Sequence, residues 1–344
     1  MAILNAPYHM IEKPIYKEIL IMKKFICVML TVLMTLSLFS GCSSAEDDGV
    51  LNIAIVQQMD HSSLDEIRFA IQAELDAIAE AKGLRVEYKH FNGQNDASVL
   101  NQIGAQIVSD RYDAIIPIAT TAAQCMVTAA EGTSIPIIYA AISDPEGNGL
   151  TGFPNVTGTS DALNTPYILD MMFAAQPDIK TVGLLYSNSE PNSQTPIREA
   201  KEYLDAKGIP YLEKTGTTTD QIIAAASALV DRVDAVFTPT DNMVMGAEGA
   251  VAEILNNAGI PHYAGADSFV LSGAFATCGV NYTDLGTKTA QMAMDILMGG
   301  EVPEFHVMAG GIITVNTETA AMLNIDYSVF ATGGNIINEV TTAE

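Results

Sequence analysis

Short apolar runs alternate with longer amphipathic stretches along most of this chain. Runs of strand length cover residues 51–57, 84–91, 113–119, 135–139 and 156–160, and helical spacing covers residues 63–82, 98–109 and 122–130. Ser63-Leu64-Asp65-Glu66 has the form of a capping box, which predicts that the first helix opens there and stops at Gly83. The alternation of strand and helix predicts a parallel sheet covered by helices on both faces.

The same order of elements begins again at Asn164, and the letters themselves repeat. Asp113-Ala114-Ile115-Ile116 has a counterpart 121 residues later, in Asp234-Ala235-Val236-Phe237. Ile135-Pro136 likewise recurs as Ile260-Pro261. Because these repeats keep their order and spacing, the sequence predicts two similar α/β lobes.

The segment from Met22 to Cys42 has the pattern of an export signal. Met22-Lys23-Lys24 is followed by an apolar run over residues 25–39 and by Ser40-Gly41-Cys42. We therefore expect residues 22–41 to be a lipoprotein signal peptide, Cys42 to be lipidated, and residues 42–50 to be a flexible tether. Residues 1–21 are then an upstream start assigned in error. The alternative interpretation is an uncleaved membrane anchor.

The net charge of the chain argues against a nucleic-acid partner. Residues 1–41 hold four basic and two acidic residues, so the remaining chain keeps 12 basic and 39 acidic residues, a net charge of −27. A surface of that charge repels phosphate backbones, so we expect no nucleic-acid partner.

Cysteine and histidine positions do not suggest a metal site. Cys125 lies in a predicted helix and Cys278 in a predicted strand, and both are expected to be thiols in the protein interior. No CxxC or HExxH motif occurs, so no metal and no cofactor is predicted.

Polar clusters follow the predicted strands in both halves. Ligands of open parallel sheets bind beyond the carboxyl ends of the strands, where loops meet helix N-termini. Ser, Thr, Asp and Asn also cap helices, so each residue alone fits either role. The candidate ligand-binding residues are Ser62, Ser63, Thr120, Thr121, Ser143, Asp144, Ser160, Asp161, Tyr186, Asn188, Ser189, Glu190, Asn192, Asp241, Asn242 and Asp267.

Seven short segments of the chain together resemble one family. They are Ser63-Leu64-Asp65, Ile118-Ala119-Thr120-Thr121-Ala122-Ala123-Gln124, Ile142-Ser143-Asp144-Pro145, Val156-Thr157-Gly158-Thr159-Ser160-Asp161, Leu185-Tyr186-Ser187-Asn188-Ser189-Glu190-Pro191-Asn192-Ser193, Pro239-Thr240-Asp241-Asn242 and Asp284-Leu285-Gly286. In this order they resemble, over residues 50–327, the substrate-binding lipoproteins of ABC transporters whose members bind tryptophan, phenylalanine or tyrosine. The family commonly has Thr-Pro where this chain has Thr120-Thr121.

The resemblance implies a type I periplasmic-binding fold, an α/β architecture of two doubly wound parallel-sheet lobes joined by a three-crossing hinge. Lobe 1 is expected at 51–160 plus 277–306 and lobe 2 at 161–276 plus 307–332, with a tail at 333–344. The crossings fall near Ser160, Ala276 and Val307. The resemblance also implies an extracytoplasmic protein with a small-molecule ligand, ABC permease and ATPase subunits as partners, and a membrane contact through the lipid anchor.

An amino-acid ligand needs acceptors for its ammonium group and donors for its carboxylate. We expect Asp241 to bind the ammonium group through charge-assisted hydrogen bonds. Hydroxyls and helix N-termini would hold the carboxylate, which assigns that role to Ser63, Thr120 and Thr121. Asn188 and Glu190 would close over the ligand, and Tyr186 would pack on its side chain.

Other classes of function fit the sequence less well. The loop after the first strand has no glycine, so a dinucleotide-dependent enzyme is disfavoured, and no GxSxG elbow of a hydrolase occurs. Asp60, His61 and Ser63 lie too close along one loop for a catalytic trio, so no enzymatic activity is expected. A ligand sensor, or a nucleoside- or sugar-binding relative on the same fold, is the remaining alternative. The lack of Trp disfavours a sugar site.

Overall fold

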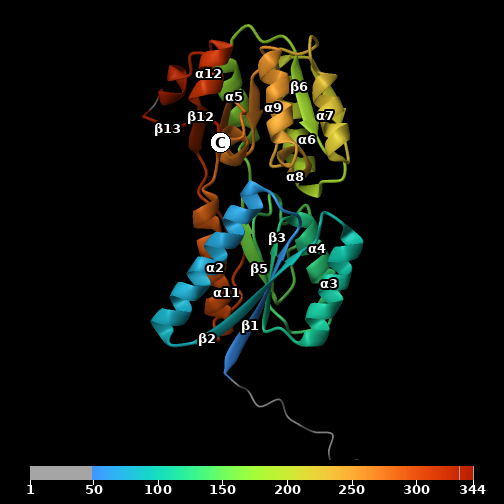
Figure 1. Cartoon of the computed structure of the whole chain (residues 1–344), viewed down its shortest axis with the longest axis vertical. Coiled ribbons are helices and arrows are strands. Elements are labelled where there is room, and N and C mark those ends of the chain that lie inside the picture. Colours follow the sequence, from blue (N-terminus) through green and yellow to red (C-terminus); the bar gives the residue numbers. More distant parts are fainter. Residues whose placement is uncertain (1–48, 333, 344) are drawn as a thin grey trace, which may run out of the picture. The chain divides into compact units, whose positions relative to one another are not determined.

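The computed structural model describes residues 49–332 and 334–343 (Figure 1). From Val50 onward the chain forms one compact unit. The predicted signal peptide and Cys42 lie outside the described residues. Within them, none of the helices combines the length and apolar character needed to span a bilayer.

The first sheet has six parallel strands in the order β11-β5-β4-β3-β1-β2. Its strands are β1 (Val50–Gln57), β2 (Arg85–Asn92), β3 (Ala114–Ile118), β4 (Ile137–Tyr139), β5 (Val156–Ser160) and β11 (His306–Val307). The helices around it are α2 (Ser62–Lys82), α3 (Ala97–Asp110), α4 (Thr120–Ala129) and α11 (Tyr282–Leu297). Figure 1 shows α2 beside α11 and α3 beside α4.

Alternate side chains of β1 enter different hydrophobic layers. Ile53 and Ile55 belong to the cluster that contains Ile67 of α2. Val56 belongs to the cluster that contains Leu100 of α3. Because side chains alternate across a strand, an unbroken apolar run is what a strand covered on both faces requires.

The second sheet has seven strands in the order β13-β12-β10-β9-β8-β6-β7. Its strands are β6 (Val182–Tyr186), β7 (Tyr211–Thr215), β8 (Ala235–Thr238), β9 (His262–Ala264), β10 (Ala276–Gly279), β12 (Ile312–Asn316) and β13 (Ile337–Val340). All neighbours in this sheet are parallel except β10 and β12. The helices of this part are α5 (Thr165–Ala175), α6 (Pro191–Lys207), α7 (Thr219–Ser227), α8 (Asn242–Met245), α9 (Glu248–Asn257), α10 (Asp267–Leu271), α12 (Thr317–Leu323) and the 3-10 turn η1 (Ser328–Ala331).

The repeated letters occupy equivalent places in the two sheets. Asp113 precedes β3, and its Oδ2 accepts a hydrogen bond from the Asn52 backbone N–H at 2.7 Å. Asp234 precedes β8, and its Oδ2 accepts from the backbone N–H groups of Lys180 and Thr181 at 2.8 and 2.9 Å. Each aspartate therefore joins the start of a central strand to the start of its neighbour. The prediction of two similar α/β lobes is confirmed.

The predicted capping box is wrong. Helix α2 begins at Ser62, and its N-cap is His61, which makes no side-chain capping bond. Ser63 lies inside the first turn, and its hydroxyl contacts the Ser268 hydroxyl of the second lobe. The Ser63 side chain therefore makes a contact between the lobes, and it does not cap α2 as the local pattern predicted.

The second predicted crossing between the lobes shifts by a few residues, whereas the third stays near Val307. The strand Ala276–Gly279 belongs wholly to the second sheet, so the second crossing follows Gly279 and not Ala276. His306–Val307 pairs with β5 of the first sheet, which places the third crossing after Val307.

The predicted tail also carries structure. Residues Ile337–Val340 form β13, which pairs with β12, and Ile337 packs against the core of the second lobe. A four-residue strand that is half exposed has too little periodicity to predict from sequence.

Candidate functional site

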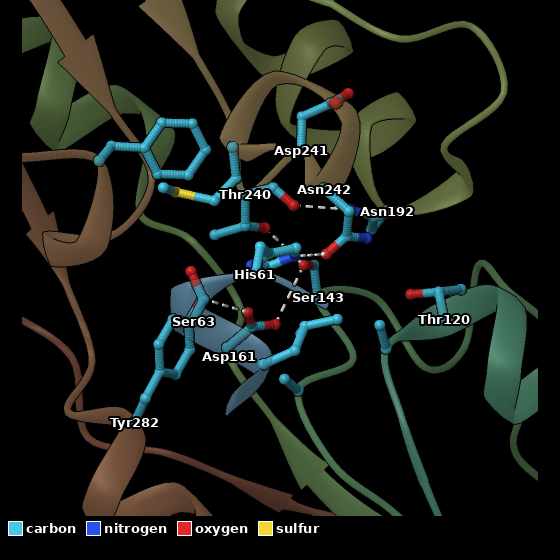
Figure 2. A pocket seen from close by; sticks show the side chains of 15 residues that line it. His61, Ser63, Thr120, Ser143, Asp161, Asn192, Thr240, Asp241, Asn242 and Tyr282 are labelled. Carbon is cyan, nitrogen blue, oxygen red and sulfur yellow. Dashed lines mark hydrogen bonds between the residues drawn. The ribbon is translucent and has the colours of Figure 1, made fainter. Parts of the chain in front are cut away.

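A small cavity lies where the loops of the two lobes meet (Figure 2). Its volume is about 20 Å³, which is room for about one water molecule. The lining residues are His61, Ser63, Leu64, Ala119, Thr120, Ala141, Ser143, Asp161, Asn192, Thr240, Asp241, Asn242, Met245, Phe269 and Tyr282. Because ligand sites usually measure about 300–1,000 Å³, the lobes must part to admit an organic ligand.

Two strained alanines follow neighbouring strands of the first sheet. Ala119 comes directly after β3 and has φ 76° and ψ 161°, and Ala141 follows β4 with φ 58°. A residue with a Cβ atom in such a conformation costs about 1–3 kcal/mol, and such residues cluster at functional sites. Both alanines line the cavity, and Ala119 turns the chain so that Thr120 opens α4 beside it.

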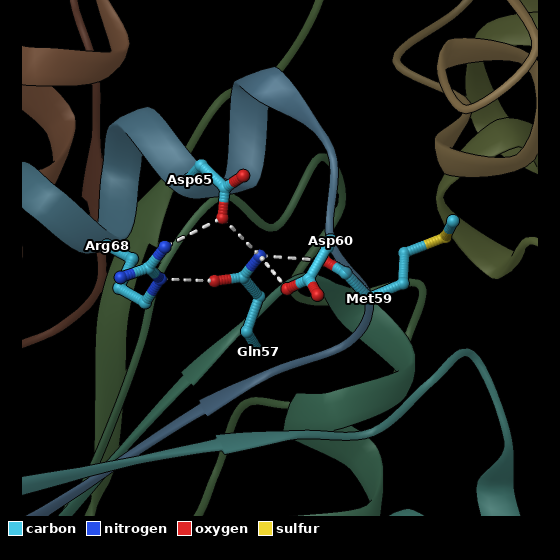
Figure 3. Close-up of polar contacts among 5 residues, drawn as sticks. All are labelled: Gln57, Met59, Asp60, Asp65 and Arg68. Atoms are coloured by element: carbon cyan, nitrogen blue, oxygen red, sulfur yellow. Dashed lines mark hydrogen bonds and ion pairs between the residues drawn. The ribbon is translucent and has the colours of Figure 1, made fainter.

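The loop between β1 and α2 is stabilised from behind the cavity (Figure 3). The Gln57 side-chain amide donates to the Met59 carbonyl at 2.8 Å and to Asp65 Oδ1 at 3.0 Å. Arg68 donates to Gln57 Oε1 at 2.8 Å and pairs with Asp65 at 2.9 Å. The positive charge of Arg68 is therefore paired with Asp65 beside this loop. The same loop carries His61, which lines the cavity. Of the described residues that line the cavity, none is Lys or Arg.

Asp161 is a buried carboxylate on the cavity wall, just after β5. Its Oδ1 accepts from the Ser143 hydroxyl at 3.0 Å and its Oδ2 from the Tyr282 hydroxyl at 3.2 Å. Burial raises the pKa of Asp161, and the hydrogen bonds from Ser143 and Tyr282 oppose that rise. Ser143 also contacts the Thr240 hydroxyl at 3.1 Å, so the group around Asp161 reaches the second lobe.

Asp241 has a different environment, although it lines the same cavity. Its Oδ2 accepts from the Ser187 backbone N–H at 2.7 Å and from the Ser193 hydroxyl at 2.6 Å, while Oδ1 accepts from the Val244 backbone N–H at 3.0 Å. Figure 2 shows its carboxylate directed away from Ser143 and Asp161. The predicted ammonium partner is therefore committed to capping α8 and joining loops of its own lobe.

Glu190 lies at the contact between the lobes. Its Oε1 accepts from the Gln58 amide at 3.0 Å and its Oε2 from the Asn242 amide at 2.7 Å. Burial, with a smaller contribution from the nearby Asp241, raises the pKa of Glu190 to about 8. Further contacts between the lobes join His61 to Asn242 at 3.0 Å and Thr195 to Asp144 at 2.8 Å.

The structure places seven of the predicted ligand-binding residues on the cavity wall. They are Ser63, Thr120, Ser143, Asp161, Asn192, Asp241 and Asn242. Their role in ligand binding stays a prediction.

Two residues that were predicted to contact the ligand from the second lobe do not line this cavity. The Tyr186 hydroxyl donates to Glu213 at 2.7 Å, so its ring does not face the cavity. Asn188 is exposed and its amide donates to Thr215 Oγ1. Loop position alone could not show which way these side chains turn.

The other predicted residues lie outside the cavity lining for local reasons. Ser62 and Ser189 are exposed, and the Ser160 hydroxyl accepts from the Ala162 backbone N–H. Thr121 uses its backbone N–H to bind Gln58. Asp144 accepts from Gly147 and Thr195. Glu190 accepts from Gln58 and Asn242. Asp267 is the first residue of α10.

Sequence reasoning missed several lining residues. Thr240 precedes the predicted pair Asp241-Asn242, and Tyr282 is the first residue of α11 after the second crossing. Their positions next to predicted features are the signal that could have found them. Leu64, Met245 and Phe269 form an apolar part of the wall and have no distinguishing local pattern.

Comparison with known sequences agrees with this architecture. A family model described as ABC transporter substrate binding protein matches residues 52–330. A tyrosine-binding protein from Clostridioides difficile is 30% identical over 321 residues, covering 88% of this chain and 91% of that protein.

Solved structures give the same picture. An ABC domain in complex with L-Trp from Streptococcus pneumonia has a TM-score of 0.78 at 29% identity, covering 84% of this chain and 99% of the other. The ligand-free, open structure of a substrate binding protein with adhesive properties from Clostridium difficile has a TM-score of 0.64 at 32% identity, covering 85% and 100%. Although the open structure is slightly more similar in sequence, it is less similar in shape, in keeping with the lobe contacts seen here. Solute binding proteins with bound allitol and with bound myo-inositol, at 14% and 16% identity, share the fold alone.

Proposed function

We propose that this chain, which belongs to the ABC transporter substrate binding protein family, captures a free amino acid between its lobes. Proteins of this family act outside the cytoplasm together with an ABC transporter. The proposed ligand has an aromatic or other apolar side chain. The observation that carries the proposal is Asp161, a buried carboxylate on the cavity wall whose side-chain hydrogen-bond donors are two hydroxyls. An ammonium group supplies the positive charge that such a carboxylate lacks.

The remaining wall suits the other parts of an amino acid. Asn192 has a buried side-chain oxygen that finds no partner among residues 49–332 and 334–343, which offers the ammonium group a second acceptor. Within the same part of the chain the buried Thr120 hydroxyl, at the N-terminus of a ten-residue helix, also has no partner. A ligand carboxylate would receive a hydrogen bond there and favourable interaction with the helix dipole. Leu64, Met245 and Phe269 would contact the apolar side chain.

Binding is coupled to closure in this proposal. The lobes touch through Gln58 and Glu190, His61 and Asn242, and Ser143 and Thr240. A ligand that contacts both walls favours the closed form to the extent that it binds that form more tightly. Permease subunits can then recognise closure, and ATPase subunits drive transport.

A screen for ligands tests the proposal directly. Thermal-shift measurements on the purified protein with the twenty amino acids, nucleosides and sugars should raise the melting temperature for aromatic amino acids, because a ligand stabilises the form it binds. Calorimetry should then give a dissociation constant in the micromolar range, about 8 kcal/mol. A shift with a nucleoside or a sugar and none with any amino acid would contradict the proposal.

We also propose that Cys42 carries a lipid that holds the protein at the membrane. The basic start at Met22, the apolar run and Ser40-Gly41-Cys42 support this proposal. In cells that express the full chain, Cys42→Ala should move the protein from the membrane fraction to the soluble fraction, whereas Cys125→Ala should leave it in the membrane fraction. Membrane retention of the Cys42 variant would support the uncleaved anchor instead.

A further inference from the structure

His61 has a ring nitrogen with no hydrogen-bond partner in the described part of the chain. Its Nδ1 is buried, and the residue lines the cavity. The other ring nitrogen, Nε2, lies 3.0 Å from Asn242 Oδ1. An unpaired buried polar atom is costly, so its position on the wall of a ligand site needs a physical reason.

When both Glu190 oxygens accept, as they do in the ionised carboxylate at a pH above about 8, a chain of side-chain amides determines which ring nitrogen carries the proton. The Thr121 backbone N–H donates to Gln58 Oε1 at 3.1 Å, so the Gln58 amide nitrogen faces Glu190 Oε1 at 3.0 Å. The Asn242 amide nitrogen donates to Glu190 Oε2 at 2.7 Å. The Asn242 oxygen therefore faces His61 and accepts its Nε2–H.

His61 is consequently a neutral acceptor. Burial lowers its pKa, which leaves one proton on the ring. With that proton on Nε2, the Nδ1 atom carries a lone pair and can only accept. Of the two aspartates on the same wall, Asp241 is occupied by donors of its own lobe, and Asp161 is the one that an ammonium group would prefer to a neutral imidazole.

We propose that His61 is a specificity-determining residue whose Nδ1 accepts a hydrogen bond from an uncharged donor on the ligand side chain. The site then selects side chains with a phenol hydroxyl or an indole N–H over a plain hydrocarbon ring. The apolar wall of Leu64, Met245 and Phe269 accommodates the rest of such a ring. This inference rests on the proposed amino-acid function and narrows it to ligands such as L-tyrosine or L-tryptophan.

The test compares ligands that differ by one donor. If L-tyrosine is the ligand, calorimetry should give at least about tenfold weaker binding for L-phenylalanine and for O-methyl-L-tyrosine. If L-tryptophan is the ligand, 1-methyl-L-tryptophan should bind at least about tenfold more weakly. In each case the ligand without the donor leaves Nδ1 unpaired. L-phenylalanine is smaller than L-tyrosine and O-methyl-L-tyrosine is larger, so a loss shared by both is not a matter of size.

Substitution of His61 should remove this preference. In His61→Leu the affinity ratio between L-tyrosine and L-phenylalanine should fall to about one, while L-phenylalanine still binds. His90→Leu is the matched control, because His90 lies on β2 with an unpartnered Nε2 but does not line the cavity. That variant should keep the wild-type ratio.

NMR of the wild-type protein supplies a measurement that needs no variant. At a pH above 8, where Glu190 is ionised, nitrogen-15 shifts should place the His61 proton on Nε2 and should show a change at Nδ1 when L-tyrosine or L-tryptophan binds. A proton on Nδ1, equal wild-type affinity for all these ligands, or an unchanged ratio in His61→Leu would overturn the role of His61 while leaving amino-acid binding intact. Failure to bind any amino acid would overturn both proposals.

Discussion

Asp161 and Asp241 are two buried aspartates on the wall of one cavity, yet their surroundings differ. Asp241 accepts two backbone N–H groups and one hydroxyl from its own lobe. Asp161 accepts two hydroxyls and borders the space between the lobes. Burial raises the pKa of both carboxyl groups. The two carboxylates differ in the hydrogen-bond donors that compensate for the loss of contact with water.

The contrast separates a structural carboxylate from one available to a ligand. Backbone donors at a helix N-terminus hold Asp241 in place and use its lone pairs. Hydroxyls hold Asp161 less completely, because each of them can also accept a hydrogen bond. We therefore assign the ammonium group to Asp161 and expect the two aspartates to respond differently to the same substitution.

Asp161→Asn should have the largest effect of the substitutions considered. Loss of the charge should weaken binding of the amino-acid ligand about a hundredfold, because a charge-assisted hydrogen bond is replaced by a neutral one. The free energy of unfolding should stay the same or increase, since a buried charge is removed. Calorimetry with L-tyrosine and a denaturant titration measure both effects. Unchanged affinity would contradict the role of Asp161.

Asp241→Asn should mainly reduce stability. The free energy of unfolding should fall by about 2 kcal/mol, because the carboxylate that caps α8 loses its charge. Ligand affinity of the folded variant should stay within about threefold of wild type. Denaturant titration and calorimetry of the same preparation check both statements. A large loss of affinity at unchanged stability would restore Asp241 as the ammonium partner.

Glu190→Gln should change how binding depends on pH. Burial at the contact between the lobes raises the pKa of Glu190 to about 8. We expect opening of the lobes to expose Glu190 and return its pKa toward the ordinary value, so that closure takes up a proton. The contribution of Glu190 to closure is then complete below its ordinary pKa and is lost as pH rises through about 8. Wild-type affinity should therefore fall between pH 6 and 8.5, by up to about seventyfold. The Gln variant should show a flatter profile. Calorimetry in buffers of different ionisation enthalpy measures the proton uptake, and equal uptake in both proteins would contradict it.

The smallest effects should come from the hydroxyls that donate to the two aspartates. Ser193→Ala removes a donor to Asp241 and should lower the free energy of unfolding by about 1 kcal/mol without changing affinity. Ser143→Ala removes a donor to Asp161 and should weaken ligand binding about threefold with a smaller loss of stability. Denaturant titrations and calorimetry of the pair provide matched controls. The opposite pattern would reverse the assignments of the two carboxylates.

Much of the fold could be predicted because its signals are local. The strand at 156–160 and the elements before it follow from hydrophobic periodicity, which depends on neighbouring residues. The repeat of Asp113-Ala114 as Asp234-Ala235 revealed the second lobe, and both aspartates make the same strand-joining bonds. The rule that ligands bind beyond the carboxyl ends of parallel strands pointed to Thr120 and Asn242, and both residues line the cavity.

The roles of individual side chains depended on partners far along the chain. Asp161 meets the Tyr282 hydroxyl 121 residues away, and Gln58 meets Glu190 132 residues away. Ser63 has the local pattern of a cap but contacts Ser268 of the other lobe. The two-lobed α/β architecture and the loops that carry its polar residues could be predicted from the amino-acid sequence, because periodicity and repetition are properties of short segments. Which carboxylate is occupied by other donors and which ring nitrogen of the described residues is unpaired became visible in the folded protein, because hydrogen bonds between distant segments exist only after the lobes fold and meet.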